Sequence, residues 1–295
     1  MLGDDKTIQI RMKGKWQPLF LPQKLCSYVN DHTIFKDGQN KWRVLGTCGN
    51  GPYNFLLEYF FIDCQADTPL TNMQEVRKVF HRHLKKPIKI SPFVFFDHHT
   101  KIYHLYFGHR NILHYTSKDG TDWQAEKPAI KSSWPYLRDP HIIEYADNYL
   151  MYATDIHNKI TVFRSKDLYH WRRTGVALRL GNKVPKSVNS SCESPFVLKY
   201  GDEYLLFTTI VPSPFGRRKH YLDTHVFISK DPLHFGHFSQ DQKNTAHLIA
   251  QLETHAPEII HYQNKYFVTS CGWKGFPKPK EVKEEGIFIR ELEIK

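Results

Sequence analysis

The chain has 295 residues, of which 40% are hydrophobic and 14% aromatic, enough to bury the core of one all-β domain. Lys and Arg number 41 against 30 Asp and Glu, but these charges are spread along the chain and no nucleic-acid motif accompanies them, so we expect a solvated basic surface and no nucleic-acid partner. No run of about eighteen apolar residues occurs, which argues against a membrane span, and no Pro/Gly/Ser-rich linker divides residues 1–295, so we expect a single domain.

A short cassette recurs five times along the chain. Each copy is an apolar doublet entered through Pro or His, and a polar turn and an aromatic-rich strand follow it. The copies are Asp31-His-Thr-Ile-Phe, Ser91-Pro-Phe-Val-Phe, Asp139-Pro-His-Ile-Ile, Ser194-Pro-Phe-Val-Leu and Ala256-Pro-Glu-Ile-Ile. Five hairpins at a spacing of roughly 50 to 60 residues indicate a repeat architecture.

A third strand and a Ser-Lys-Asp turn follow the hairpin in three of the units. The turns begin at Ser117, Ser165 and Ser229, and an aromatic residue stands six positions after each Ser. We expect the Asp to accept hydrogen bonds from backbone N–H groups of the turn and the aromatic ring to cover the hairpin end, a purely structural role. Each unit therefore supplies three or four antiparallel strands.

Small sheets of this kind leave edges and faces that they cannot bury alone. Radial repetition around a channel covers both, so the sequence predicts an all-β, five-bladed β-propeller. The first strand, at residues 7–12, and the last, at residues 286–294, have no partner in this scheme and would close the ring by sharing one blade.

The stretch from Thr68 to Lys89 has a different pattern. Met73, Val76, Phe80 and Leu84 lie at helical spacing behind a capping-box pattern, which predicts a helix. The alternative is a long loop that leads into the first strand of blade two.

The five cysteines are scattered and odd in number, which argues against a disulfide framework and a structural zinc site. No signal-peptide pattern stands at the start, so we expect a cytoplasmic protein, although a removed leader would leave the same sequence.

The cassettes differ at their entrances, and this is where chemistry is expected. The first strand of each propeller blade lines the central channel, so five equivalent entrance positions should converge at one end of it. These positions are Asp31, Ser91, Asp139, Ser194 with Glu193 just before it, and Ala256 with His255 just before it. Three carboxylates, Asp31, Asp139 and Glu193, would thus meet, and like charges buried together raise one another's pKa. The alternative is that Asp31 and Asp139 only cap strand entrances.

A pair of such carboxyl groups is what glycosidic bond hydrolysis requires, one as acid and one as base or nucleophile. At these residues the chain resembles the five-bladed propeller glycosidases of glycoside hydrolase families 43, 32 and 68. The resemblance rests on Asn30-Asp31, Arg138-Asp139-Pro140 and Cys192-Glu193-Ser194-Pro195 and covers nearly the whole chain. It implies that Asp31 is the base or nucleophile, Asp139 the orienting and stabilising carboxylate and Glu193 the general acid.

The resemblance also implies roles around the acids. Arg138 would contact substrate hydroxyls or a neighbouring carboxylate, unless it forms only a surface salt bridge. His255 would bind substrate or help hold a channel metal such as calcium, although no cofactor is required, and its alternative is a hydrogen-bonded channel residue. The chain ends after blade five and follows Asp31 with His-Thr-Ile, which favours family 43, but Arg-Asp-Pro resembles families 32 and 68; the family and the inverting or retaining course stay open.

Aromatic residues would supply the walls of a sugar pocket, and the candidates are Trp134, Tyr136 and Trp273, with Tyr53 and Phe55 beside them. We therefore expect a hydrolase that acts on furanosides or xylosides in small oligosaccharides. The alternatives are a non-catalytic sugar-binding propeller and a related glycoside phosphorylase. The oligomeric state cannot be predicted from these patterns.

Overall fold

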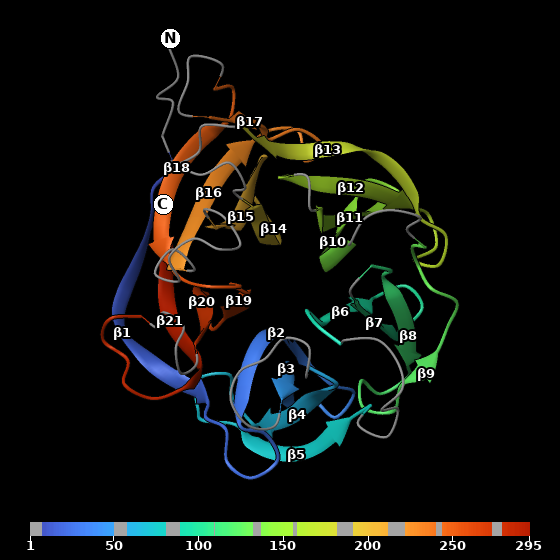
Figure 1. Cartoon of the computed structure of the whole chain (residues 1–295), viewed down its shortest axis with the longest axis vertical. Helices are drawn as coiled ribbons and strands as arrows, with labels where there is room; N and C mark the ends of the chain where they lie inside the picture. Colours follow the sequence, from blue (N-terminus) through green and yellow to red (C-terminus); the bar gives the residue numbers. More distant parts are fainter. Residues whose placement is uncertain are drawn as a thin grey trace.

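The computed structural model describes residues 8–49, 58–80, 89–108, 110–131, 137–155, 158–181, 191–211, 222–239, 244–272 and 279–295. Its strands form five small antiparallel sheets arranged around a central axis, so the fold is a five-bladed β-propeller, as predicted (Figure 1). Within the described residues, no helix is long and apolar enough to span a membrane.

Each blade consists of strands that run outward from the axis in sequence order. Blade one contains β2 (Tyr28–Lys36), β3 (Trp42–Gly49), β4 (Phe60–Ala66) and β5 (Gln74–Val79). Blade two contains β6 (Phe93–Asp97), β7 (Ile102–Phe107), β8 (Leu113–Ser117) and β9 (Gln124–Ala125). Blade three contains β10 (Leu137–Tyr145), β11 (Asn148–Asp155), β12 (Lys159–Ser165) and β13 (Arg172–Leu180). Blade four contains β14 (Ser191–Tyr200), β15 (Glu203–Val211), β16 (Asp223–Ser229) and β18 (His247–Glu253).

Blade five closes the ring. It contains β19 (Ile259–Tyr262), β20 (Lys265–Gly272) and β21 (Gly286–Ile294), and its outer strand is β1 (Ile10–Phe20). β1 pairs antiparallel with β21, so the two ends of the chain share one sheet, as the unpaired terminal strands predicted. A short strand, β17 (Gly236–Phe238), leaves blade four and pairs parallel with β13, which ties blades three and four together at the rim.

The hydrophobic core is divided among the gaps between blades. Successive side chains of a strand point to opposite faces, so each blade offers an apolar face to both neighbours. In blade one, Leu45 and Phe61 face the cluster shared with blade two, whereas Val44 and Ile62 face the cluster shared with blade five. Five such clusters, one at each blade interface, hold the ring together and fix where the inner strands begin.

The Ser-Lys-Asp turns have the predicted structural role. Asp119 accepts hydrogen bonds from the backbone N–H groups of Thr121 at 2.8 Å and Asp122 at 3.0 Å. The ring of Trp123 packs edge-on against Phe35 of the preceding blade. The turn therefore contributes to a blade interface at the rim and not to the channel.

The helix predicted between Thr68 and Lys89 is wrong, and so is the loop alternative where this stretch is described. Residues 74–79 form β5, which pairs with β4 from Phe61 to Gln65. Met73 is fully buried, but Val76 is 42% exposed, so the apolar residues do not form one helical face. An outer strand has one free edge and little alternation, and pairing to β4 decides its conformation.

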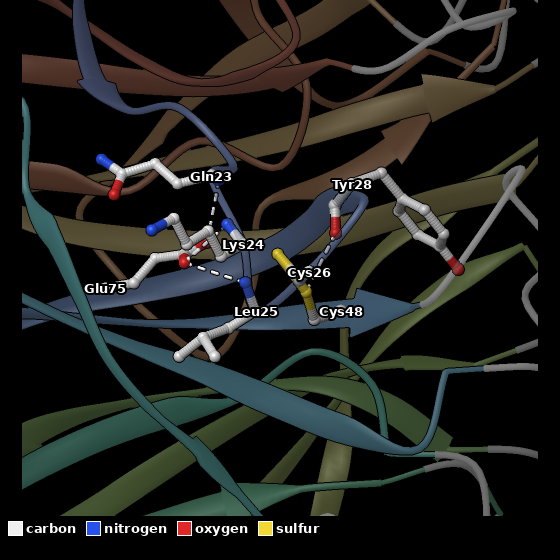
Figure 2. Close-up of a disulfide and its surroundings, with 7 residues drawn as sticks. All are labelled: Gln23, Lys24, Leu25, Cys26, Tyr28, Cys48 and Glu75. Atoms are coloured by element: carbon white, nitrogen blue, oxygen red, sulfur yellow. Dashed lines mark hydrogen bonds between the residues drawn. A yellow bond between two sulfur atoms is a disulfide. The ribbon is translucent and has the colours of Figure 1, made fainter.

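The scattered, odd-numbered cysteines argue against a disulfide framework, yet the described residues contain one disulfide. Cys26 and Cys48 are bonded, with their Cα atoms 6.0 Å apart, whereas Cys64, Cys192 and Cys271 are free and buried. The hairpin register places Val29 opposite Cys48, so the residues leading into β2 lie beside the end of β3. Figure 2 shows the carboxylate of Glu75 accepting backbone N–H groups of the segment that leads to Cys26.

Candidate active site

The inner strands β2, β6, β10, β14 and β19 surround the channel, and their entrances are irregular (Figure 1). Strand pairing shifts register between Val29 and His32, between Arg138 and His141, and between Glu193 and Phe196. These are β-bulges, which redirect side chains at the end of a strand. The entrance residues of blades two to five also have positive φ values, which are 55° at Ser91, 54° at Asp139, 52° at Ser194 and 46° at Ala256.

The five entrance residues meet in one cavity, as the repeat predicted. It is lined by Asp31, Ser91, Asp139, Ser194 and Ala256 together with the residue that follows each of them. Pro at four of those following positions holds the backbone of the bulge, because its ring fixes φ. The entrances therefore bring residues from every blade, four of them polar, to one end of the channel.

A serine hydroxyl joins two of the predicted catalytic acids. Ser91 Oγ lies 2.6 Å from Asp31 Oδ2 and 2.6 Å from Asp139 Oδ1. The other oxygen of Asp139 accepts the hydroxyl of Thr154 at 2.6 Å and the backbone N–H of Ser194 at 3.0 Å. Asp139 is thus fully hydrogen-bonded, whereas Asp31 faces the cavity with fewer partners.

Arg138 connects the third acid to this pair. Its Nη2 lies 3.3 Å from Glu193 Oε2 and its Nε lies 3.5 Å from Asp139 Oδ2. Its side chain is only 20% exposed, so it is a cavity residue beside two carboxylates and not a surface salt bridge. Burial alone would lower the pKa of Arg138, but the Glu193 and Asp139 carboxylates raise it above its usual value, so the guanidinium stays charged.

The carboxyl groups have perturbed and unequal proton affinities. Burial, and then the charge of Asp139, raises the pKa of Asp31 to about 7. Burial also raises the pKa of Glu193, although the neighbouring Arg138 partly offsets this. Both acids can therefore hold a proton at a pH where an exposed carboxyl group would be ionised, which is the property that acid–base catalysis uses.

Two further carboxyl groups lie near the predicted acids. Glu58 is 1% exposed, accepts a hydrogen bond from Asn30 Nδ2 at 3.4 Å and has a pKa well above its usual value because of burial and the charge of Asp31. Glu58 was not predicted as a site residue, and its signal is a lone charge inside the apolar run from residue 55 to 61. Glu258 lines the cavity, and burial raises its pKa well above normal.

His255 lies beside the acids, and its imidazole contacts the thiol of Cys271. It is 3% exposed, and burial lowers its pKa to about 4, so the imidazole is neutral. Its Nδ1 is 3.4 Å from the Sγ of Cys271, and one ligand atom from each of Asp31, His255 and Cys271 lies within 4.8 Å of the other two. Calcium takes six to eight oxygen ligands, and a set that includes thiol sulfur and imidazole nitrogen does not match that preference.

The predicted aromatic walls cannot be placed. Trp134, Tyr136, Trp273, Tyr53 and Phe55 all lie outside the described residues. The structure thus brings together Asp31, Asp139, Glu193, Arg138 and His255, and the sugar-facing aromatic residues stay predictions.

The fold and this cavity define a five-bladed propeller whose channel mouth holds three acids from three blades. No protein-family model and no curated protein matches the sequence. Solved structures with the same architecture are propeller glycosidases. An α-L-arabinofuranosidase from Podospora anserina in complex with cellotriose aligns with TM-score 0.64 at 13% identity, covering 97% of each chain.

Two other solved structures agree with it. An α-L-arabinanase from Penicillium chrysogenum complexed with arabinobiose has a TM-score of 0.62 at 10% identity, covering 94% of this chain and 97% of the other. A GH43_1 enzyme from Xanthomonas citri has a TM-score of 0.64 at 12% identity, covering 94% of this chain and 89% of the other. At such low identity the likeness establishes the fold, and function has to be argued from the site.

Proposed function

We propose that the protein is a glycoside hydrolase that cleaves furanosides or xylosides of the arabinose, fructose or xylose type in small oligosaccharides. The observation that carries this proposal is the joining of Asp31, Ser91 and Asp139 in one cavity with the Arg138–Glu193 pair. Arabinose-containing substrates come first among these sugars, because the solved structures of the same fold include arabinofuranosidases and arabinanases.

Glu193 is the proposed general acid. Burial raises the pKa of Glu193 and so favours its protonated form, and protonation of the glycosidic oxygen breaks the bond to the leaving sugar. The carboxylate left behind gains the Arg138 guanidinium, 3.3 Å away, as its counterion. Arg138 therefore favours the ionised product of the step and makes the proton available for transfer.

Asp31 is the proposed base or nucleophile. In its ionised form it either takes a proton from the attacking water or attacks the anomeric carbon directly, and both courses end in net hydrolysis. Asp139 is the proposed stabilising carboxylate. Hydrogen bonds from Thr154 and Ser194 hold its carboxyl group in place, and in its ionised form it would stabilise the positive charge that develops on the sugar ring.

The test is a screen of aryl arabinofuranosides, xylosides and fructosyl oligosaccharides with the wild type, Glu193→Gln and Asp31→Asn. Each variant should lose about 10² to 10⁴ in rate while still binding sugar, since acid–base groups contribute on that scale. Glu193→Gln should lose least on aryl glycosides with acidic leaving groups, because these need little protonation, whereas Asp31→Asn should lose equally on all.

The matched control is Glu144→Gln, which removes an exposed carboxylate from the far end of the strand that carries Asp139. It should leave the rate unchanged. Undiminished activity in either cavity variant would contradict the assignment of that residue. Sugar binding without turnover in the wild type would favour the non-catalytic propeller, and turnover that requires phosphate would favour the phosphorylase.

A further inference from the structure

A thiol, an imidazole and a carboxylate converge beside the proposed catalytic acids. Cys271 lies on β20 and is fully buried, His255 immediately precedes the entrance of blade five, and Asp31 comes from blade one. One ligand atom of each lies within 4.8 Å of the others, and the Cys271 Sγ to His255 Nδ1 distance is 3.4 Å.

These distances suit one bound cation of the zinc class. Zinc binds sulfur at about 2.3 Å and imidazole nitrogen at about 2.0 Å, so two such donors on a tetrahedral ion lie roughly 3.5 Å apart. Sulfur and imidazole donors select zinc and related transition metals over calcium. The donor set therefore departs from the oxygen-bound calcium expected from the family resemblance.

The protein backbone already holds two of the donors in place. The N–H of Cys271 donates to the His255 carbonyl at 3.2 Å, and the N–H of His255 donates to Ser270 Oγ at 3.0 Å. Asn30 supports the set from outside, because its Oδ1 lies 3.8 Å from the thiol while its amide donates to Glu58. Outer contacts of this kind orient metal ligands and strengthen binding.

The charge of the cavity favours a cation at this position. Among the described ion pairs, Arg138 is the cation that contacts the catalytic acids, and its partners are Asp139 and Glu193. Asp31 and Glu58 are left without a cationic partner in that set, and each lies within the electrostatic reach of the other. A divalent ion bound to Asp31 would compensate both.

We propose that Asp31, His255 and Cys271 form a binding site for a thiophilic divalent cation, and that an ion bound there blocks hydrolysis by occupying the Asp31 carboxylate. The binding half of this proposal stands on the donor geometry alone. The blocking half rests on the proposed glycosidase function.

The binding half is tested by cobalt(II) titration of the whole protein. A thiolate ligand gives cobalt a sulfur-to-metal charge-transfer absorption in the near ultraviolet, which surface histidines and carboxylates do not. We expect this absorption in the wild type, its displacement by zinc and no effect of calcium. Cys271→Ser should abolish the absorption and weaken zinc binding at least tenfold.

Two variants control for other sites. Cys64→Ser removes another free buried cysteine, on β4, and should bind cobalt as the wild type does. His99→Ala removes one member of a second group of possible metal ligands, which consists of Asp97, His99 and Glu144. This group contains no sulfur, so the variant should not affect the charge-transfer band. A band that persists in Cys271→Ser, or no band in the wild type, would overturn the binding proposal.

The blocking half is tested by zinc inhibition of aryl-glycoside hydrolysis. Zinc should inhibit the wild type and Cys64→Ser at concentrations that leave Cys271→Ser active. Zinc binding at Cys271 without inhibition would overturn the blocking role alone. If no glycoside is hydrolysed, the proposed function fails, but the cobalt spectrum still decides whether the metal site exists.

Discussion

Removal of the Ser91 hydroxyl should shift the acid limb of the pH–rate profile to lower pH. A hydroxyl has one proton, yet Ser91 Oγ lies 2.6 Å from a carboxylate oxygen of Asp31 and of Asp139. It can donate to only one of them, so the second short contact needs a proton from a carboxyl group. Burial raises the pKa of Asp31 to about 7, so the extra proton is expected on Asp31.

The magnitude follows from counting hydrogen bonds. With Asp31 protonated, the carboxyl group donates to Ser91 and Ser91 donates to Asp139, which makes two bonds; with both acids ionised, one remains. Ser91→Ala therefore removes two hydrogen bonds from the protonated pair but one from the ionised pair. The protonated pair loses one additional charge-assisted hydrogen bond, which is about 1.5 to 3 kcal/mol. At about 1.4 kcal/mol per pKa unit, the acid limb should move from near 7 down by about 1 to 2 units.

The assay is kcat/KM against pH on a neutral aryl glycoside, together with infrared titration of the protonated carboxyl band in the free protein. Ser194→Ala is the control, because it removes a hydroxyl from an equivalent entrance where only the backbone N–H contacts Asp139. Alanine fits this backbone, as Ala256 has a φ of 46° at its own entrance.

The direction of the shift decides the reasoning. If Ser91 only donates to an ionised Asp31, its removal would raise the pKa of that carboxyl group, and the limb would move to higher pH. A shift upward would refute the shared proton. An unchanged limb would show that neither Asp31 nor Asp139 controls it.

Three further predictions concern stability. The folded pKa of Asp31 is raised above its unfolded value, so its contribution to stability falls as pH rises from about 4 to 7. Asp31→Asn should therefore be more stable than the wild type at pH 8, by about 1 to 3 kcal/mol in urea unfolding. A stability difference that does not narrow at pH 4 would contradict this. Arg43→Ala removes one of the two arginine partners of the 2%-exposed Asp63 carboxylate, which keeps Arg77 at 3.1 Å, and should lower the free energy of unfolding by about 1 to 3 kcal/mol; an unchanged free energy would show that the pair is dispensable. Burial lowers the pKa of His114, which lies beside His104, to about 3, so below pH 6.5 the unfolded chain binds more protons than the folded chain. His114→Gln should reduce the slope of the unfolding free energy against pH by about 1.4 kcal/mol per pH unit between pH 6 and 4.5. An unchanged slope would show that His114 does not contribute to acid destabilisation.

The propeller could be predicted because its repeat is visible in one sequence. The cassettes correspond to the inner hairpins, whose strands are almost wholly buried and so have strong apolar patterns, as in β3. The outer strand β5 could not be predicted, since it alternates weakly and Met73, Val76 and Phe80 happen to have helical spacing. Its conformation depends on pairing with β4, which is a tertiary effect.

The site could be predicted only where it lies at repeat positions. Asp31, Asp139 and Glu193 stand at or next to cassette entrances, so internal alignment finds them. Glu58 precedes β4 and Cys271 lies within β20, and neither occupies an entrance. Their approach to the cavity depends on how neighbouring blades pack, which no local pattern shows.

The strained entrances show which part of the site belongs to the scaffold. Positive φ at a non-glycine residue often marks a functional site. Here Ala256, which has no polar side chain, has the same conformation as Asp139, with φ values of 46° and 54°. The positive φ is therefore a property of the repeat, present with or without an acid. It follows that side-chain identity at the entrances, and not backbone strain, distinguishes the chemistry of each blade. An acid at the Ala256 entrance would have a backbone conformation similar to that of Asp139, but not the hydrogen bonds from Ser91 and Thr154 that fix the Asp139 side chain.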